Sequence, residues 1–402
     1  MIKSKLNKID LIILAGGRGS RISKLTKKKP KPLIKFKNKH FISYLINHYS
    51  KYPFQKIFIL AGYKGQQIFK KFNKKISNGI EIECIVEKTE LGTGGALSQL
   101  GKKTSNNLII MNGDSFIKSD LSNFFINTKQ KDSNYIFLTK SKIYKSNKTL
   151  SNLNINRKSF INFNGNLMNS GIYYLKNSIL KKIPKRKISL ENSIIYDLIK
   201  KEKIKGKISQ SKFIDIGTYK NLYFGKKNFH KQFEQPAAFL DRDGVINYDY
   251  GHVHNMRNFH LRLNVIKGLK YLNKKNYNIF IVTNQSGIAR GMFTENEYLS
   301  FYKSIKEYFF SKGCFINDMQ YCPFLKGALI KKYDKSSKLR KPGNLMILNL
   351  MNKWIIDKKK SFMIGDHKKD QFAAKKSKLY FEYAKNNFNS QIQKIIKNFS
   401  SY

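Results

Sequence analysis

Short apolar runs alternate with polar segments of helical length along the chain. The clearest of these runs cover residues 11–15, 56–61, 80–86, 108–111, 279–283 and 362–364. Runs of this length are typical of buried strands, and their alternation with helices predicts sheets that are covered by helices on both faces. The fold class is therefore α/β, with two Rossmann-like domains: a mixed, mostly parallel sheet followed by a parallel sheet.

Two acids follow directly on one apolar run in the second half. Residues 239–247 read FLDRDGVIN, which places Asp241 and Asp243 at the end of a short strand. There, one carboxylate can attack phosphorus while the other handles protons, and a hard cation can neutralise the phosphate. An Asp-rich turn after a strand is the alternative. The catalytic interpretation is favoured by a hydroxyl, two cations and two further acids in later segments: Thr283, Arg340, Lys341, Asp366 and Asp370.

In this order and spacing, these segments resemble the four motifs of the haloacid dehalogenase-like phosphotransferases. Further runs are similar to the branch that contains the D,D-heptose 1,7-bisphosphate phosphatases and the histidinol-phosphatases. These runs are DYGHVH at 249–254, VTNQSGIARG at 282–291, YCP at 321–323 and RKP at 340–342.

The resemblance implies a role for each matching residue. Asp241 would become an aspartyl-phosphate, and Asp243 would protonate the leaving oxygen and then activate water. Substrate would be bound by Thr283, Asn284, Arg340 and Lys341. Asp366 would complete a Mg²⁺ site with Asp241 and Asp243, and Asp370 would support that site.

Two features of this branch concern loops rather than strand ends. His252 and His254 fall where the branch contacts substrate, and an ordinary loop position is the alternative. The branch also carries a structural zinc held by Cys-x-His and a later Cys-x-Cys, of which Cys322 alone remains. The other ligand positions hold Phe324, Ser337 and Leu339. No zinc is expected, and Cys322 is expected to be a small buried residue.

In the first half, a strand runs into glycines at residues 11–21, LIILAGGRGSR. Gly16 and Gly17 allow backbone N–H groups to approach phosphate, and Arg21 adds charge, although ordinary loops also hold such turns. The continuation KPKPL at 29–33 resembles the signature of the sugar-1-phosphate nucleotidyltransferases. The resemblance implies that Arg21 and Lys31 hold a triphosphate, while a solvated lysine is the alternative for Lys31.

Later segments extend this second resemblance. The run EKTELGTGGA at 87–96 resembles the base-recognition loop, with Glu87 and Gly92 as binding residues. The remaining matches imply two metal aspartates and a sugar site: Asp114, Asp215, Asn169, Gly171 and Glu191. One segment departs from the family, because FINFNGN at 160–166 lacks the Phe-x-Glu-Lys whose lysine contacts the sugar phosphate.

Glu87 bears on the choice of nucleotide. A carboxylate only accepts hydrogen bonds, and guanine offers two adjacent donors on its Watson–Crick edge, whereas uracil and thymine offer one N–H there. The residue therefore favours GTP, and a solvated glutamate at the end of a strand is the alternative.

Length and charge limit the other possibilities. The 402 residues suffice for a domain over 1–228, a linker over 229–236 and a domain over 237–402. The net charge of +53 comes from dispersed lysines, since only nine of the 78 basic residues are arginine, so a nucleic-acid partner is not expected. Three cysteines, the absence of a signal-peptide pattern and short apolar runs favour the cytoplasm and no membrane partner.

The two resemblances together imply one bifunctional enzyme. It would remove the 7-phosphate from D-glycero-D-manno-heptose 1,7-bisphosphate and then load the 1-phosphate with GMP, giving GDP-heptose for surface polysaccharide such as lipopolysaccharide. Another sugar phosphate or another nucleotide is the first alternative. A half that serves as a catalytically dead interaction module is the second, and the oligomeric state stays open.

Overall fold

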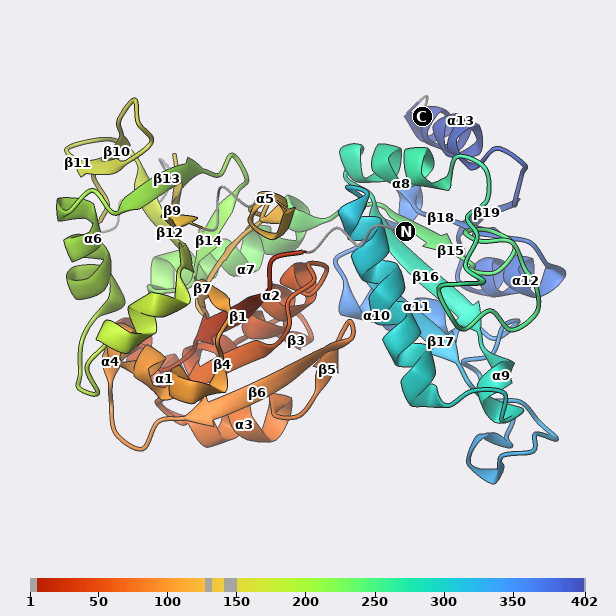
Figure 1. Cartoon of the computed structure of the whole chain (residues 1–402), viewed down its shortest axis with the longest axis horizontal. Helices are drawn as coiled ribbons and strands as arrows, with labels where there is room; N and C mark the ends of the chain where they lie inside the picture. The colour runs from red at the N-terminus through yellow and green to blue at the C-terminus, as the bar shows by residue number, and fades with distance from the viewer. Residues whose placement is uncertain (1–5, 127–131, 141–149, 401–402) are drawn as a thin grey trace. The chain divides into compact units, whose positions relative to one another are not determined.

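The computed structural model describes residues 6–126, 132–140 and 150–400. The backbone separates into two compact units, Met1–Gln232 and Phe233–Tyr402, each with its own sheet (Figure 1). Helix α7 covers Tyr219–Phe233, so it includes residues 229–233 of the expected linker, and the chain starts its next strand at Ala237. Among the described helices, none is both long and apolar enough to span a bilayer.

The first unit is built on an eight-stranded sheet with the order β13-β9-β12-β7-β1-β4-β6-β5. Its strands are β1 (Ile9–Leu14), β4 (Ile57–Ala61), β5 (Ile76–Ser77), β6 (Ile80–Val86), β7 (Asn107–Asn112), β9 (Asn134–Thr139), β12 (Met168–Leu175) and β13 (Ile204–Ile208). The smaller strands pair as β2 (Lys35–Phe36) with β3 (Lys39–His40), β8 (Ser115–Ile117) with β14 (Phe213–Asp215), and β10 (Leu153–Ile155) with β11 (Ile161–Phe163).

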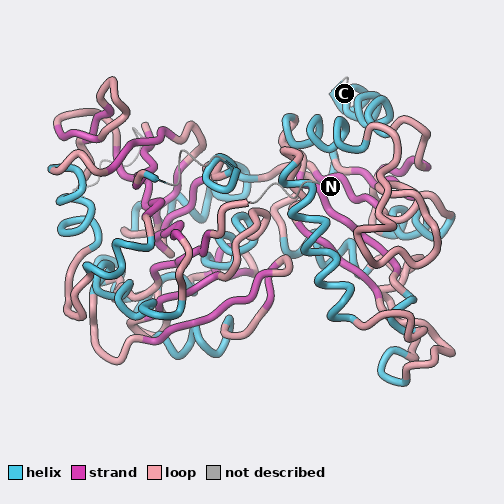
Figure 2. The backbone as a smooth tube through the Cα atoms, viewed as in Figure 1, coloured by secondary structure: helices cyan, strands magenta, loops and turns pink. Residues whose placement is uncertain are grey.

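The centre of this sheet is parallel, because β1 lies between β4 and β7 in the same direction. Strand β12 runs antiparallel to both of its neighbours, so the sheet is mixed as predicted. The helices of the unit are α1 (Ser23–Thr26), α2 (Phe41–Tyr49), α3 (Gly65–Phe72), α4 (Gly92–Gly95), α5 (Ser122–Ile126), α6 (Tyr196–Lys200) and α7. Figure 2 shows these helices on both sides of the strands.

The second unit has a five-stranded sheet in which every pairing is parallel, as predicted. The order β17-β16-β15-β18-β19 places β15 (Ala237–Leu240) at the centre, and the others are β16 (Asn278–Asn284), β17 (Asp318–Cys322), β18 (Phe362–Gly365) and β19 (Tyr380–Tyr383). The helices are α8 (Val265–Lys274), α9 (Ser286–Ala289), α10 (Glu295–Ser311), α11 (Leu345–Lys353), α12 (Lys368–Lys376) and α13 (Phe388–Ser400).

Alternate residues of β15 face opposite sides of this sheet. Ala238 and Leu240 belong to the core formed with α8, α10 and α13, whereas Ala237 and Phe239 belong to the core formed with α11 and α12. A strand that is covered on both faces must be apolar throughout, which explains its continuous apolar sequence. The first position that can hold a polar residue is therefore the one after the strand ends, which is Asp241.

Candidate active sites

The active site predicted for the second unit lies at the carboxyl ends of the parallel strands β15, β16 and β18. Because such ends meet at one edge of a sheet, segments far apart in sequence come together there. A cavity of about 200 Å³ at this edge is lined by most of the residues expected from the sequence: Asp241, Asp243, Thr283, Asn284, Arg340 and Asp366.

Lys341 lies fully buried among the carboxylates. Its Nζ is 2.6 Å from Oδ2 of Asp241 and 2.7 Å from Oδ1 of Asp370, and it donates to the carbonyl of Val282 at 2.9 Å. Burial opposes its charge, yet the two carboxylates raise the pKa of Lys341. Burial likewise raises the pKa of Asp241 to about 7, although Lys341 opposes this shift. The nucleophile predicted from the sequence therefore lies in a dry, charged setting.

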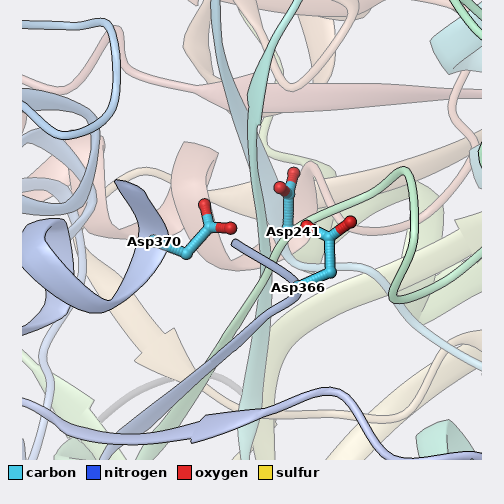
Figure 3. A group of neighbouring side chains, drawn as sticks. All are labelled: Asp241, Asp366 and Asp370. Atoms are coloured by element: carbon cyan, nitrogen blue, oxygen red, sulfur yellow. The ribbon is translucent and has the colours of Figure 1, made fainter. Parts of the chain in front are cut away.

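Three carboxylates converge on one space, as Figure 3 shows, with Asp370 reaching in from the start of α12. Oxygen atoms of Asp241, Asp366 and Asp370 lie within 4.8 Å of one another. Oδ1 of Asp366 is buried without a hydrogen-bond partner among the described residues, and burial raises the pKa of Asp366. Hard cations prefer such oxygen ligands, so this donor set fits a divalent cation.

Gly244 makes room for this cluster. It adopts a φ of 77°, which favours glycine, and a Cβ placed there would collide with the carboxylate of Asp366. Asp370 is divided between two tasks, because its Oδ2 also accepts from the backbone N–H of His367 at 3.0 Å. That bond caps helix α12, which agrees with the supporting role expected for Asp370.

Asp243 lies apart from these three carboxylates, although the sequence suggested it as a metal ligand. Its side chain instead accepts hydrogen bonds from Arg242, Asn247 and Gln285. Arg242 is fully buried and lies over the rings of Tyr298 and Phe301. Both carboxylate oxygens of Asp243 thus accept hydrogen bonds from neighbouring side chains.

The two histidines of the neighbouring loop differ in position. His252 lines the cavity and has a φ of 51°. The ring of His254 stacks on Phe293 with 4.5 Å between centroids, and its Nδ1 lies 2.9 Å from the carbonyl of His252. His254 is therefore packed into the loop, and His252 is the one of the pair that reaches the cavity.

Cys322 is completely buried, as predicted, in the core below α11 and α12. Phe324 and Leu339, which occupy positions of the zinc ligands, pack against the same core. Burial raises the pKa of the Cys322 thiol. Phe324 and Leu339, at positions where the branch has zinc ligands, therefore make apolar contacts with the core that contains Cys322.

The first unit also brings its two predicted metal aspartates together. Asp215 pairs with Ser115 across β14 and β8, and the backbone N–H of Ile216 donates to the carbonyl of Asp114 at 3.0 Å. Nζ of Lys31 lies 2.9 Å from Oδ2 of Asp114. Asp215 is almost fully buried and accepts from the backbone N–H of Gly217.

A cavity of about 270 Å³ at this position is lined by residues expected to hold the nucleotide, including Gly16, Gly17, Arg21, Lys31, Glu87, Gly92 and Asp114. Glu87 lies between glycines that follow two different strands. A Cβ on Gly16 would lie 2.9 Å from Oε1 of Glu87, and a Cβ on Gly62 would lie 3.0 Å from Oε2. Oε2 also accepts from the N–H of Leu91 at 3.2 Å, and burial raises the pKa of Glu87.

A second cavity of about 210 Å³ shares Asn112 and Glu191 with the first and includes Asn169 and Gly171. Glu191 is fixed by hydroxyls, since Thr93 donates to its Oε2 at 2.9 Å and Tyr173 donates to its Oε1 at 3.2 Å. Gly171 has a φ of 78°, and a Cβ there would lie 2.9 Å from Nδ2 of Asn112. Every predicted sugar-binding residue thus lines one cavity.

Gly92 lets the glycine loop of the first unit approach another backbone segment. Its φ is 69°, and a Cβ on it would lie 2.5 Å from the carbonyl oxygen of Ile188.

The segment 160–166, which departs from the family, contains strand β11, and this strand forms a small antiparallel pair with β10.

Several residues of the two sites were not predicted from the sequence. Gly62 follows a recognised strand, and Thr93 and Gln285 lie within recognised motifs, but the role of each depends on a side chain from another segment. The signal for Gly62 was available, because the run Leu60-Ala-Gly62 ends a strand in the same way as Leu14-Ala-Gly16. No local pattern marks Gln285.

Comparisons with known proteins match the two halves of the chain to different families. Residues 11–232 match the family model described as Nucleotidyl transferase, and residues 243–394 match that of Polynucleotide kinase 3 phosphatase. A D-glycero-beta-D-manno-heptose-1,7-bisphosphate 7-phosphatase of Rhodopseudomonas palustris is 39% identical over 141 residues, which are 35% of this chain and 78% of the relative. The enzyme of that name from Photorhabdus laumondii is 40% identical over 144 residues, 36% of this chain and 77% of its own.

Among solved structures, HddC from Yersinia pseudotuberculosis is 26% identical over 55% of this chain and 99% of its own, with a TM-score of 0.47. A second structure of HddC is a complex with GMP-PN. A putative phosphatase of the haloacid dehalogenase-like class from Mesorhizobium loti is 22% identical over 42% of this chain and 87% of its own, with a TM-score of 0.38.

Fold and sites define a nucleotidyltransferase joined to a haloacid dehalogenase-like phosphatase, as the sequence predicted. The chain belongs to the nucleotidyl transferase family through its first unit and to the D-glycero-D-manno-heptose-1,7-bisphosphate 7-phosphatase family through its second.

Proposed function

We propose that this chain is a bifunctional enzyme of nucleotide-activated heptose formation. The second unit would remove the 7-phosphate of D-glycero-D-manno-heptose 1,7-bisphosphate, and the first would transfer a nucleotidyl group to the resulting heptose 1-phosphate. The observation that carries the first step is the buried Lys341 between Asp241 and Asp370, in a unit whose relatives are heptose-bisphosphate phosphatases.

In the phosphatase step, the carboxylate of Asp241 would attack phosphorus as the bond from phosphorus to the sugar oxygen breaks. Asp243, protonated in the substrate complex, would give its proton to that oxygen. Its carboxylate would then take a proton from the water that attacks the aspartyl-phosphate, which releases inorganic phosphate and restores Asp241. Thr283 and Arg340 would donate to the phosphoryl oxygens. Mg²⁺ held by Asp241 and Asp366 would supply positive charge to the phosphate.

Lys341 would have a positional role in the same step. It neutralises Asp241 and Asp370 together, so that two carboxylates can lie side by side out of water. Asp370 would hold Lys341 in place while it caps α12.

In the transfer step, an oxygen of the heptose 1-phosphate would attack the α-phosphorus of the nucleotide, and pyrophosphate would leave. Arg21 and Lys31 would bind the triphosphate, and Asp114 and Asp215 would hold Mg²⁺, which offsets charge on the phosphates. Gly171 would leave room for the sugar beside Asn112.

We infer that the nucleotide is GTP. Oε1 and Oε2 of Glu87 lie against Gly16 and Gly62, so the carboxylate is fixed in one orientation at the cavity. Two fixed acceptors would match the adjacent N1–H and N2–H donors of guanine, and bases with a single N–H would leave one acceptor unmatched.

A panel assay tests both reactions. Purified chain would be incubated in Mg²⁺ with heptose and hexose phosphates and with each nucleoside triphosphate, while phosphate and pyrophosphate release are measured separately. Phosphate release from heptose 1,7-bisphosphate, followed by GTP-dependent pyrophosphate release, is the expected result. Failure of either reaction with every substrate would identify that unit as non-catalytic.

A second candidate keeps both reactions but takes another sugar phosphate. It is favoured by the segment 160–166, which lacks the lysine that contacts the sugar phosphate in the family. A hexose phosphate that outperforms its heptose counterpart in the same panel would select this candidate. Because both reactions use phosphorylated small molecules, the cytoplasm is the compartment that suits them.

A further inference from the structure

Three side chains form the cradle around Asp243, by which we mean the groups that donate hydrogen bonds to its two carboxylate oxygens: Arg242, Asn247 and Gln285. Arg242 donates to Oδ1 from Nη2 at 2.9 Å and to Oδ2 from the same nitrogen at 2.7 Å. Asn247 donates to Oδ1 at 2.9 Å, and Gln285 donates to Oδ2 at 3.1 Å. Asp243 therefore has a single resting position, fixed from several directions.

Gln285 differs from the other members of the cradle because it lines the phosphatase cavity together with Asp243 and Thr283. It is itself 2% exposed. Its Nε2 donates to Oδ2 of Asp243 and also to Oγ1 of Thr283, at 2.8 Å. One amide group thus links the proposed acid–base with the hydroxyl proposed to bind the phosphoryl group.

The orientation of this amide follows from the chemistry of its neighbours. A guanidinium nitrogen can only donate, so the atom of the Gln285 amide that faces Arg242 must be the oxygen, and the NH₂ faces Asp243. The opposite atom, Oε1, lies 3.5 Å from Nη2 of Arg242, which can only donate. The hydroxyl of Thr283 uses its oxygen to accept from Gln285, and its own hydrogen is left to donate toward the cavity.

We propose that Gln285 is a positioning residue of the phosphatase reaction, which sets Oδ2 of Asp243 and the hydroxyl of Thr283 relative to the phosphoryl group. Arg242 and Asn247 hold the rear of the Asp243 carboxylate, and Gln285 holds the side that faces the substrate. This inference rests on the proposed phosphatase function. It adds that proton delivery to the leaving oxygen depends on a side chain that touches neither the proton nor phosphorus.

The test compares two leaving groups. A sugar alkoxide is a poor leaving group and needs the proton from Asp243, whereas p-nitrophenolate leaves without it. In Gln285→Met, kcat/KM for heptose 1,7-bisphosphate is expected to fall about 100-fold, in line with the usual contribution of a positioned acid. For p-nitrophenyl phosphate the fall is expected to stay within about fivefold, since kcat/KM reports the steps up to formation of the aspartyl-phosphate.

Gln391→Met is the matched control. Gln391 is buried in the same unit and donates to Glu382 at 3.0 Å and to the carbonyl of Tyr383 at 2.8 Å. Its replacement removes a comparable set of hydrogen bonds and should leave both values of kcat/KM unchanged. Trp354 fluorescence reports whether each variant folds, because this sole tryptophan belongs to the second unit.

Gln285→Glu serves as a second variant that keeps the size of the side chain and removes the donor. It should show the same split between the two esters, and it keeps the test decisive should Gln285→Met fail to fold. An equal fall for both esters, or no fall for either, would overturn the inference. If wild-type protein released no phosphate from either ester, the proposed phosphatase function itself would be at fault.

Discussion

The two sites each place a lysine beside an aspartate at the end of a strand, but they differ in how far they exclude water. The side chain of Lys341 is 0% exposed, and its partners Asp241 and Asp370 are 8% and 0% exposed. In the first unit, Lys31 is 9% exposed, and its partner Asp114 is 25% exposed. The charges around Lys341 in the phosphatase site are therefore more deeply buried than the Lys31–Asp114 pair of the nucleotidyltransferase site.

This contrast has an energetic consequence. A buried charge is stabilised by its partners and by little else, so removal of one partner is costly. A half-exposed pair is screened by water and contributes less. The phosphatase centre should consequently respond to charge changes through both activity and stability, and the nucleotidyltransferase centre mainly through activity.

The largest expected effect is the loss of one activity alone. Asp241→Asn removes the nucleophile, so phosphate release should fall by at least about 10⁴-fold, while pyrophosphate release with supplied heptose 1-phosphate stays close to wild type. Asp114→Asn is the reciprocal variant and should spare phosphate release. Parallel loss of both activities in either variant would contradict two independent sites.

The next effect concerns stability and tests the contrast directly. Lys341→Met leaves Asp241 and Asp370 buried without their shared cation, which should cost about 3–5 kcal/mol of unfolding free energy. Trp354 fluorescence during denaturant titration measures this, because the tryptophan belongs to the core of the second unit. Lys31→Met should leave the Trp354 transition in place. A Lys341→Met protein as stable as wild type would show that the centre is wetter than its geometry indicates.

The deficit of Lys341→Met should depend on pH. Burial already raises the pKa of Asp241 to about 7 in the presence of Lys341, so loss of the cation should raise it further. The folded variant then binds more protons than the unfolded chain, and its stability rises as the pH falls. Asp241 of the folded wild type itself takes up a proton near pH 7, so the gap to wild type is expected to narrow as the pH falls from the alkaline range to about 7. A difference in unfolding free energy that widens over this range would show that loss of Lys341 does not raise the pKa of Asp241.

The sequence alone located the apolar strands that lead into the two sites, including β1, β6, β7, β15, β16 and β18, but not strands such as β9, β13 and β19. Strand β15 is a clear case, because its continuous apolar run is imposed by cores on both faces, and Asp241 follows where those cores stop. What the motifs could not supply was the partner of each residue. The link from Gln285 to both Asp243 and Thr283, and the place of Glu87 against Gly62, depend on which strands lie side by side in the folded sheet.

Substitution of Glu87 in the nucleotidyltransferase site should have a smaller effect, which is on nucleotide preference. Glu87→Gln keeps the shape of the side chain but turns one acceptor into a donor that would face a donor of guanine. The loss of about 1–3 kcal/mol corresponds to roughly a ten- to hundredfold fall in the preference for GTP. The measurement is kcat/KM for GTP, ATP, CTP and UTP in wild type and variant, and an unchanged ranking would make Glu87 a bystander.

Gly62→Ala tests the role of Glu87 in the preference for GTP while the charge of Glu87 is kept. A Cβ on Gly62 would lie 2.8 Å from the carbonyl oxygen of Gly16 and 3.0 Å from Oε2 of Glu87, so the backbone at Gly16 must shift and the carboxylate must move with it. The preference for GTP should fall while binding of the triphosphate persists. A variant that loses all nucleotides equally would show that Gly62 supports the loop as a whole.

The smallest expected effect is that of a zinc chelator on the phosphatase. The zinc site of this branch would need cysteine thiolates, but burial raises the pKa of Cys322, and Phe324 and Leu339 pack against its core in place of further ligands. The loop is held instead by Glu295, which accepts from the hydroxyls of Tyr321 at 2.7 Å and Tyr333 at 2.8 Å.

Purified protein should therefore hold less than one zinc per chain, and phosphatase activity in Mg²⁺ should survive a zinc-selective chelator. Glu295→Ala is the informative counterpart, because it removes two hydrogen bonds to a charged group and should lower the stability of the second unit by about 2 kcal/mol. Elemental analysis and Trp354 fluorescence measure the two outcomes. Tight stoichiometric zinc, or a Glu295→Ala protein as stable as wild type, would show that the loop is held by metal rather than by these hydrogen bonds.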